Sequence, residues 1–274
     1  MAETPAVVPV RVGLLYDRLA AIGQELFGAS LHFGYWPASN GVPAPASLPE
    51  ATRRLTGHLV DRLAVPPGSR VLDIGCGSGA AGVELATRRQ VHVHGISVSA
   101  TEVRQANDLA RTTGQARFQF GTATAPAFAD GTFDAAWALE SLCHVPDRAA
   151  ALTATARVLR PGARLLVTDF VTDTPHRAPH AIAPYAAPGT MAPLLTPAEY
   201  RNLLLSCGFA IRWHEDLTER VLPPTYAALT AALHARGADL RRRYGRDLVR
   251  CFERPNPATP RALAYHVFTV ERRG

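Results

Sequence analysis

The run of glycines that follows residue 74 constrains this chain more than any other feature. The apolar segment Arg70–Ile74 is predicted to be a short strand, and it leads directly into Gly75, Gly77 and Gly79. Glycine lets the backbone turn sharply and approach a ligand closely. The helix predicted next, Ala80–Arg89, would present the free N–H groups of its first turn to that ligand. The sequence therefore predicts a ligand-binding loop between a strand and a helix.

The segments that follow continue to alternate between strand and helix patterns. Further strands are expected at Val91–Ile96, Phe118–Phe120, Phe133–Ala138, Arg164–Val171, Ile211–His214 and Tyr265–Val270, and helices at Ser99–Gly114, Arg148–Leu159 and Thr196–Cys207. Ser99 and Thr196 each open a capping-box pattern, because a glutamate follows three residues later. The alternation predicts an α/β fold with a Rossmann-like, doubly wound, mostly parallel sheet of seven strands.

Three regions are expected along the chain. Residues 1–65 form an N-terminal cap with helices at Gly13–Phe27 and Ala51–Leu63, separated by a loop over Ala38–Pro49. Residues 66–175 form the ligand-binding core. Residues 176–274 complete the sheet, and a mostly helical stretch at about 221–261 is predicted to be a lid.

Composition excludes several classes of protein. No run of about 18 uncharged apolar residues is present, and Met1–Val10 lacks a basic start before an apolar stretch, so neither membrane insertion nor secretion is expected. The four cysteines are far apart without a CxxC pair, which indicates free thiols in the cytoplasm. His92 and His94 have no third ligand nearby in the sequence, so no metal site is expected.

The net charge of +6 comes with an unusual composition, because all 29 basic residues are arginine. The densest cluster, Arg241–Arg243 with Arg246, has only Tyr244 as an aromatic neighbour. Nucleic-acid surfaces usually interleave several aromatic residues with the charge. The cluster is therefore interpreted as an exposed helix face, with no nucleic-acid partner.

Two classes of ligand compete for the glycine loop. Gly77, Gly79 and Gly82 also fit the GxGxxG pattern of dinucleotide-binding proteins. Such proteins place an acidic residue at the end of the second strand to hold the ribose, and this strand ends at Ser97 without one. Asp73, before the first glycine, suits a cationic ligand better than an anionic pyrophosphate.

At this point the sequence resembles a known family. Val71–Gly79 resembles motif I of the class I S-adenosylmethionine-dependent methyltransferases, and the likeness extends over about residues 14–175. It continues through His32–Trp36, Gly95–Ser99, Phe133–Trp137, Ala138–Arg148, Arg157–Gly162 and Thr168–Phe170. These segments resemble the natural-product branch, which includes bacterial sugar O-methyltransferases and is related to sterol, tocopherol and cyclopropane-forming enzymes.

The resemblance implies S-adenosylmethionine as cofactor and assigns roles to individual residues. Asp73 would support its amino group, and Gly75 and Gly77 would pass close to its methionine part. Ile96 and Ser97 would flank the ribose and adenine, Thr122 and Ala123 would lie along the adenine, and Leu139 would meet the cofactor from the fourth strand. Two positions differ from many relatives, which carry glutamine at Glu102 and aspartate at Thr122. Glu102 is either a cofactor contact or simply the acid of the capping box.

Methyl transfer to a hydroxyl group also requires a base, and histidine is the side chain most often used. His144 follows the fourth strand and Asp169 lies in the fifth, so both are expected near the cofactor. Asp169 would orient His144 or hold the acceptor hydroxyl. In the alternative interpretation, His144 caps the following helix and Asp169 is a structural hydrogen-bonding residue.

The sequence leaves the methylated atom open. The favoured hypothesis is O-methylation of a small natural product. The first alternative is C-methylation of an isoprenoid or aromatic acceptor through a carbocation that Tyr16, Phe33, Tyr35 and Trp36 could stabilise; these four residues are the predicted substrate contacts. The second is a nicotinamide-dependent oxidoreductase. The N-terminal helix is a candidate interface for a homo-oligomer.

Overall fold

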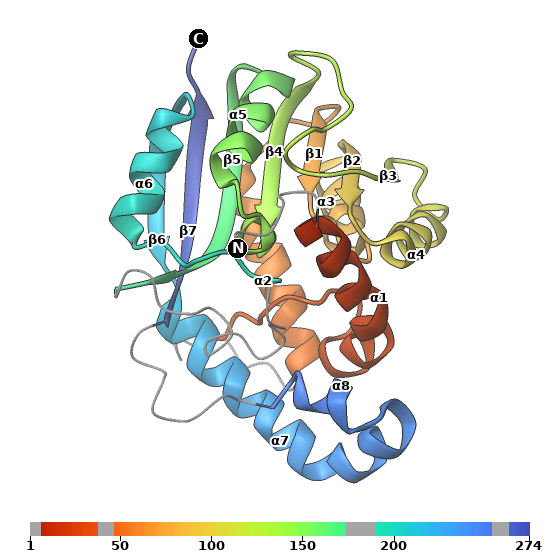
Figure 1. Cartoon of the computed structure of the whole chain (residues 1–274). Coiled ribbons are helices and arrows are strands. Elements are labelled where there is room, and N and C mark those ends of the chain that lie inside the picture. Colours follow the sequence, from red (N-terminus) through yellow and green to blue (C-terminus); the bar gives the residue numbers. More distant parts are fainter. Residues whose placement is uncertain (1–6, 38–46, 174–189, 254–262) are drawn as a thin grey trace.

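A computed structural model of the chain describes residues 7–37, 47–173, 190–253 and 263–274. Its centre is a seven-stranded sheet in the order β3-β2-β1-β4-β5-β7-β6 (Figure 1). The strands are β1 Arg70–Ile74, β2 His92–Ser97, β3 Ala116–Phe120, β4 Phe133–Leu139, β5 Leu159–Thr172, β6 Phe209–Asp216 and β7 Leu263–Arg272. β1 to β5 pair in parallel, and β7 is antiparallel to both of its neighbours. The predicted fold class is confirmed.

Helices cover both faces of the sheet. They are α1 Val7–Phe27, α2 Leu48–Leu63, α3 Ala80–Arg89, α4 Ala100–Ala110, α5 Arg148–Val158, α6 Pro197–Ser206, α7 Thr218–Tyr244 and α8 Arg246–Arg250, with a short 3-10 turn η1 at Leu142–His144. Successive strand residues point to opposite faces. Val71 accordingly joins the apolar core beneath α1 to α4, α7 and α8, while Leu72 joins the core beneath α5 and α6.

The two N-terminal helices begin earlier than the sequence pattern predicts. α1 begins at Val7 and α2 at Leu48, so Pro9 and Pro49 lie in first helical turns instead of marking loops. Proline is tolerated there because the first N–H groups of a helix have no partner within it. Ser47 caps α2 by accepting a hydrogen bond from the Glu50 N–H at 3.3 Å. Most of the loop predicted at Ala38–Pro49 lies outside the described residues.

The helical segment predicted between the last two strands is present as α7 and α8, and α7 packs against α1, α2 and β7. The arginine cluster in α7 forms ion pairs within the chain: Arg241 with Glu253, Arg242 with Asp239, and Arg243 with Glu25 of α1. These contacts account for three of the clustered charges without an external partner. The Arg243–Glu25 pair also attaches the end of α7 to α1.

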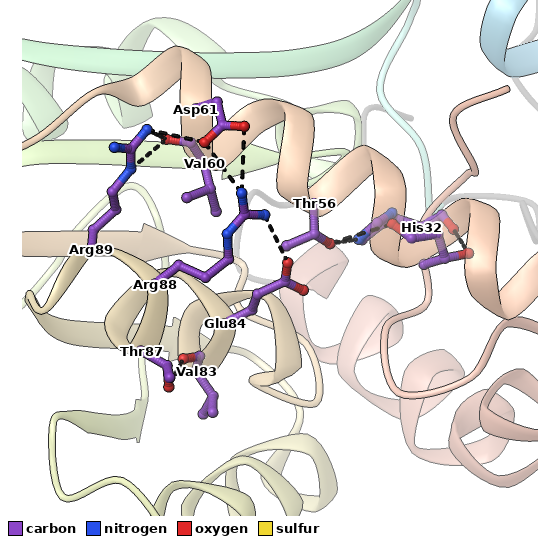
Figure 2. A network of polar contacts seen from close by, with 10 residues as sticks. His32, Thr56, Val60, Asp61, Val83, Glu84, Thr87, Arg88 and Arg89 are labelled. Atoms are coloured by element: carbon purple, nitrogen blue, oxygen red, sulfur yellow. Dashed lines mark hydrogen bonds and ion pairs between the residues drawn. The ribbon is translucent and has the colours of Figure 1, made fainter. Parts of the chain in front are cut away.

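A network of polar contacts attaches α2 to its neighbours (Figure 2). Arg88 and Arg89 at the end of α3 both bind Asp61 of α2, and Arg89 also donates to the Val60 carbonyl. Nearer the middle of α2, the His32 ring contacts the Thr56 hydroxyl at 3.0 Å. The network fixes the helix that follows the glycine loop relative to α2.

Two searches of the described residues were negative. None of their helices is long and apolar enough to cross a membrane. No group of three or more His, Cys, Asp or Glu among them is placed to hold a metal ion. His94 instead packs edge-on against Phe128 and Phe133.

Candidate active site

A cavity of about 280 Å³ opens at the carboxyl ends of the strands, beside the point where the strand order reverses between β1 and β4. Ligands of doubly wound sheets bind at such a reversal. All nine predicted cofactor residues line this cavity: Asp73, Gly75, Gly77, Ile96, Ser97, Glu102, Thr122, Ala123 and Leu139. The wall therefore unites positions that are spread over 67 residues of sequence, from 73 to 139.

The glycine loop gives the cavity its backbone lining. Gly75 and Gly77 have φ values of +75° and +53°, a region that side chains disfavour. A Cβ atom on Gly77 would meet nothing closer than Glu102 Oε1 at 3.7 Å, so this part of the loop faces open space. In α3, a Cβ atom on Gly82 would lie 2.9 Å from Asp73 Oδ2. Gly82 thus permits close packing of α3 on Asp73, and does not require a dinucleotide.

Asp73 carries an unused hydrogen-bond acceptor. Its side chain is buried, and Oδ2 has no hydrogen-bond partner among the described residues. Burial raises the pKa of this carboxyl group to about 7, and the nearby Trp137 side chain offsets part of that rise. An unpartnered buried acceptor is costly unless a ligand supplies a donor. The site therefore fits a ligand with an ammonium group, as S-adenosylmethionine has.

An acidic side chain does reach the end of the second strand, contrary to the sequence argument. The Ser97 hydroxyl, at the end of β2, donates to Glu102 Oε2 at 2.7 Å, and Glu102 comes from the first turn of α4. Ser99 caps α4 by accepting from the Glu102 N–H at 3.0 Å, but the Glu102 carboxyl turns to Ser97 and does not complete a capping box. Burial raises its pKa to about 7. Glu102 is thus a wall residue as well as part of the helix start, whereas the capping box at Thr196 is complete.

His144 lies in η1 on the cavity wall with both ring nitrogens engaged. Nδ1 lies 2.7 Å from the Thr190 carbonyl oxygen, which can only accept, so Nδ1 carries the proton. Nε2 therefore accepts from the Tyr16 hydroxyl of α1 at 2.8 Å. Burial lowers the pKa of His144 to about 4, so the ring is neutral near pH 7. The arrangement holds a neutral imidazole of fixed tautomer beside the predicted cofactor residues.

Asp169 does not orient His144, and this prediction is wrong for the described structure. Asp169 is fully buried in β5 and is not part of the cavity wall. Its Oδ2 accepts from the Tyr200 hydroxyl of α6 at 2.9 Å, and its Oδ1 accepts from the Phe170 N–H at 2.8 Å. The Thr190 carbonyl takes the orienting position instead. Residue 190 lies after the last recognisable motif, so no sequence signal indicated it.

Three of the four predicted substrate contacts lie outside the cavity wall, and only Tyr16 belongs to it. Phe33 is fully buried and packs edge-on against Phe170 of β5. Tyr35 stacks on His58 at 4.9 Å between ring centroids. The Trp36 indole donates to the Thr225 hydroxyl at 3.2 Å. These rings hold the segment after α1 against its neighbours.

The Trp36 backbone shows how α7 accepts one of its two internal prolines. Pro224 has no N–H to donate to the carbonyl of Arg220, four residues earlier. The Trp36 N–H donates to that carbonyl at 2.9 Å and replaces the lost bond.

No α7 residue is part of the cavity wall, which α1 covers instead through Pro9, Val12 and Tyr16. The predicted lid role of residues 221–261 is therefore not supported by the described part of that segment.

Glu140 is a wall residue for which no role was predicted. It follows β4 with a φ of +49°, a conformation that is rare for a residue with a side chain. Its Oε1 accepts from the Phe33 N–H and from the Tyr265 hydroxyl, both at 2.9 Å. Strained residues of this kind concentrate at functional sites. A left-handed glutamate has no signature in a single sequence.

Comparison with known proteins agrees with this site. The model of a methyltransferase domain matches residues 72–167. The O-methyltransferase resE of Aspergillus sclerotiorum is 33% identical over 266 residues, which are 95% of this chain and 96% of the relative. The 27-O-demethylrifamycin SV methyltransferase of Amycolatopsis mediterranei is 42% identical over 166 residues, 60% of this chain and 59% of the relative.

Among solved structures, the [4+2]-cyclase SpnF superposes with a TM-score of 0.79 and 27% identity, covering 96% of both chains. Fold, cavity and relatives together define an S-adenosylmethionine-dependent methyltransferase of class I. The chain belongs to this family, in the branch that methylates natural products, and the oxidoreductase alternative is set aside.

Proposed function

We propose that the chain methylates a hydroxyl group of its acceptor and that His144 receives the proton. The observation that carries this proposal is the fixed tautomer of His144, whose unprotonated Nε2 meets the cavity through Tyr16. A neutral imidazole can accept a proton at once, and a positioned base of this kind raises rates by roughly 10²–10⁴-fold. A pKa of about 4 keeps the ring neutral throughout the physiological range, but it also lowers the proton affinity of Nε2 relative to an ordinary histidine.

Tyr16 stands between the cavity and the base. Burial raises the pKa of its phenol well above the usual value, so the hydroxyl stays protonated and donates to His144. A hydroxyl group of the methyl acceptor would hydrogen-bond to Tyr16 Oη and pass its proton to that oxygen. At the same time, Tyr16 would pass its own proton to His144 Nε2. The relay leaves a neutral tyrosine, a protonated histidine and an oxygen nucleophile.

The cofactor residues would position the methyl donor. Bound S-adenosylmethionine supplies a methyl group already activated by the sulfonium. Asp73 would accept from the amino group through its unpartnered Oδ2, and Ser97 with Glu102 would hold the ribose. Thr122, Ala123 and Leu139 would enclose the adenine. The protein's contribution is then alignment of the acceptor oxygen with the methyl carbon at about 3–3.5 Å.

The wall chemistry favours an uncharged acceptor. In the described part of the cavity wall, the acidic side chains are Asp73, Glu102, Glu140 and Asp147, and no arginine is present there. Carboxyl groups repel phosphate or carboxylate substituents. Val12, Leu31, Leu139 and Val145 add apolar surface. We therefore propose a neutral, largely apolar natural product that carries a hydroxyl group, converted in the cytoplasm.

C-methylation has less support: of the four predicted aromatic contacts, only Tyr16 lies in the cavity wall. A carbocation intermediate calls for aromatic faces around the acceptor. Phe33, Tyr35 and Trp36, which could have supplied them, are used for packing and hydrogen bonds outside the described wall.

The test begins with calorimetric titration of the protein with S-adenosylhomocysteine, with NADP as control. Hydroxylated natural products are then screened by mass for the gain of one methyl group, and NMR of the product locates it. Methyl on oxygen, with His144→Gln losing turnover but retaining cofactor affinity, supports the proposal. Methyl on carbon, or a His144→Gln variant with wild-type kcat, contradicts it.

A further inference from the structure

The carboxyl group of Asp17 lies on the N-terminus of a different helix. Asp17 belongs to α1, and its Oδ1 accepts from the Ser99 hydroxyl at 2.5 Å and from the Thr101 N–H at 3.2 Å, both at the start of α4. Burial alone would raise the pKa of Asp17, but the hydrogen bonds from Ser99 and Thr101 lower it below its ordinary value. A carboxylate is favoured at this end of a helix by the free N–H groups and by the helix dipole.

From this contact, hydrogen bonds continue to the cofactor side of the cavity. The Ser99 hydroxyl, which donates to Asp17, also accepts from the Glu102 N–H at 3.0 Å. The Ser99 N–H donates to Ser97 Oγ at 3.1 Å, and Ser97 Oγ donates to Glu102 Oε2 at 2.7 Å. Ser97 and Glu102 both line the cavity. Asp17 is therefore joined to the Glu102 side chain through two serines.

Asp17 is also connected to His144, the proposed base, through its neighbour in α1. The preceding residue, Tyr16, donates to His144 Nε2 at 2.8 Å. One turn earlier, α1 lies directly on the turn between β2 and α4: a Cβ atom on Gly13 would lie 2.3 Å from the Val98 carbonyl oxygen. Glycine at this position allows the close approach that brings Val12 and Tyr16 into the cavity wall.

We infer that Asp17 is a positioning residue that couples the two ends of the active site. By capping α4 it keeps α1 docked over the cavity, and the docked helix sets Tyr16 on His144 while the same cap supports Ser97 and Glu102. The inference rests on the proposed roles of His144 and Glu102. It predicts that cofactor affinity and the environment of His144 change together when this cap is removed, although Asp17 itself is not part of the cavity wall.

The test compares Asp17→Ala with Asp17→Asn, and uses Gln24→Ala, an exposed position further along α1, as the matched control. Calorimetry gives the S-adenosylhomocysteine affinity. NMR of protein with ¹³C-labelled histidine, with the His144 signal assigned from His144→Gln, follows its titration between pH 5.5 and 7.5. In the wild type and in Gln24→Ala this signal should not move, because the buried ring stays neutral.

We expect Asp17→Ala to bind S-adenosylhomocysteine about fivefold more weakly, the scale of a lost helix cap, and its His144 signal to titrate as water enters. Asp17→Asn keeps an acceptor oxygen and should lose about twofold. Wild-type affinity and an unmoved His144 signal in Asp17→Ala overturn the inference. If that variant does not fold, Asp17→Asn decides: the inference requires its weaker binding to come with a His144 signal that moves, and wild-type values in both measurements overturn it. Neither the calorimetry nor the NMR uses a methyl acceptor, so the proposal of O-methylation can fail while the coupling through Asp17 stands.

Discussion

Tyr16 and His144 are 128 positions apart in the sequence, yet the tyrosine hydroxyl donates to the histidine Nε2 at 2.8 Å on the wall of the cavity. The Thr190 carbonyl fixes the opposite ring nitrogen at 2.7 Å. The pair joins the N-terminal helix α1 to the turn η1 that follows the fourth strand. It therefore forms only when α1 is docked on the core.

Replacing Tyr16 by phenylalanine should separate relay from packing. Tyr16→Phe keeps the ring and removes the hydroxyl that donates to His144. With an acceptor in hand, we expect kcat to fall about 10–100-fold, a part of what a general base contributes, while the S-adenosylhomocysteine affinity changes by less than about threefold. Steady-state kinetics and calorimetry check both values. An unchanged kcat would remove Tyr16 from the proton path.

Cofactor affinity should rise with pH. Asp73 has a raised pKa of about 7 because it is buried, and only its ionised form pairs with an ammonium group. Below pH 7 binding must therefore release a proton, so affinity should fall up to about tenfold per pH unit toward pH 6 and level off above pH 8. Calorimetry in two buffers of different ionisation enthalpy measures the released protons. Asp73→Asn should bind weakly; strong binding by this variant would argue against the assigned contact.

Glu102 should make the ligand-free protein less stable as pH rises. Burial raises its pKa from 4.5 to about 7, so between these values the folded protein holds a proton that the unfolded chain releases. The contribution of Glu102 to the free energy of unfolding is fully present below pH 4.5 and is lost as the pH rises through 7. Glu102→Gln should match the wild type at pH 5 and exceed it at pH 8 by about 1–3 kcal/mol. Urea denaturation at the two pH values tests this; equal stability at pH 8 would contradict it.

Asp169 should matter for stability and not for cofactor binding. Its carboxyl accepts from Tyr200 and from the Phe170 N–H inside the sheet–helix interface. Asp169→Ala leaves both donors buried without their partner, so the free energy of unfolding should fall by about 1–3 kcal/mol. Chemical denaturation measures the loss, and calorimetry should show an unchanged S-adenosylhomocysteine affinity. If Asp169→Ala is as stable as the wild type but has lost turnover, Asp169 takes part in catalysis after all.

Much of the architecture and of the cofactor wall could be predicted from the sequence. Strand–helix alternation and the glycine loop depend on local backbone preferences, and the carboxyl ends of parallel strands necessarily meet at one edge. Residues such as Asp73, Ile96 and Leu139, each at or near such an end, were therefore bound to converge. The division at residues 66 and 176, and a homo-oligomer through the N-terminal helix, stay predictions.

Only the tertiary structure decided the partners of individual side chains. Asp169 was expected at His144 because His144 follows the fourth strand and Asp169 lies in the fifth, but the Asp169 side chain lies against α6, away from the cavity wall. Glu102 satisfied a local capping pattern, yet its carboxyl reaches Ser97. The aromatic residues after α1 were equally suited to substrate or core. Sequence periodicity determines which face a residue lies on, whereas its partner depends on how helices far apart in the chain dock, as α1 does when Asp17 caps α4.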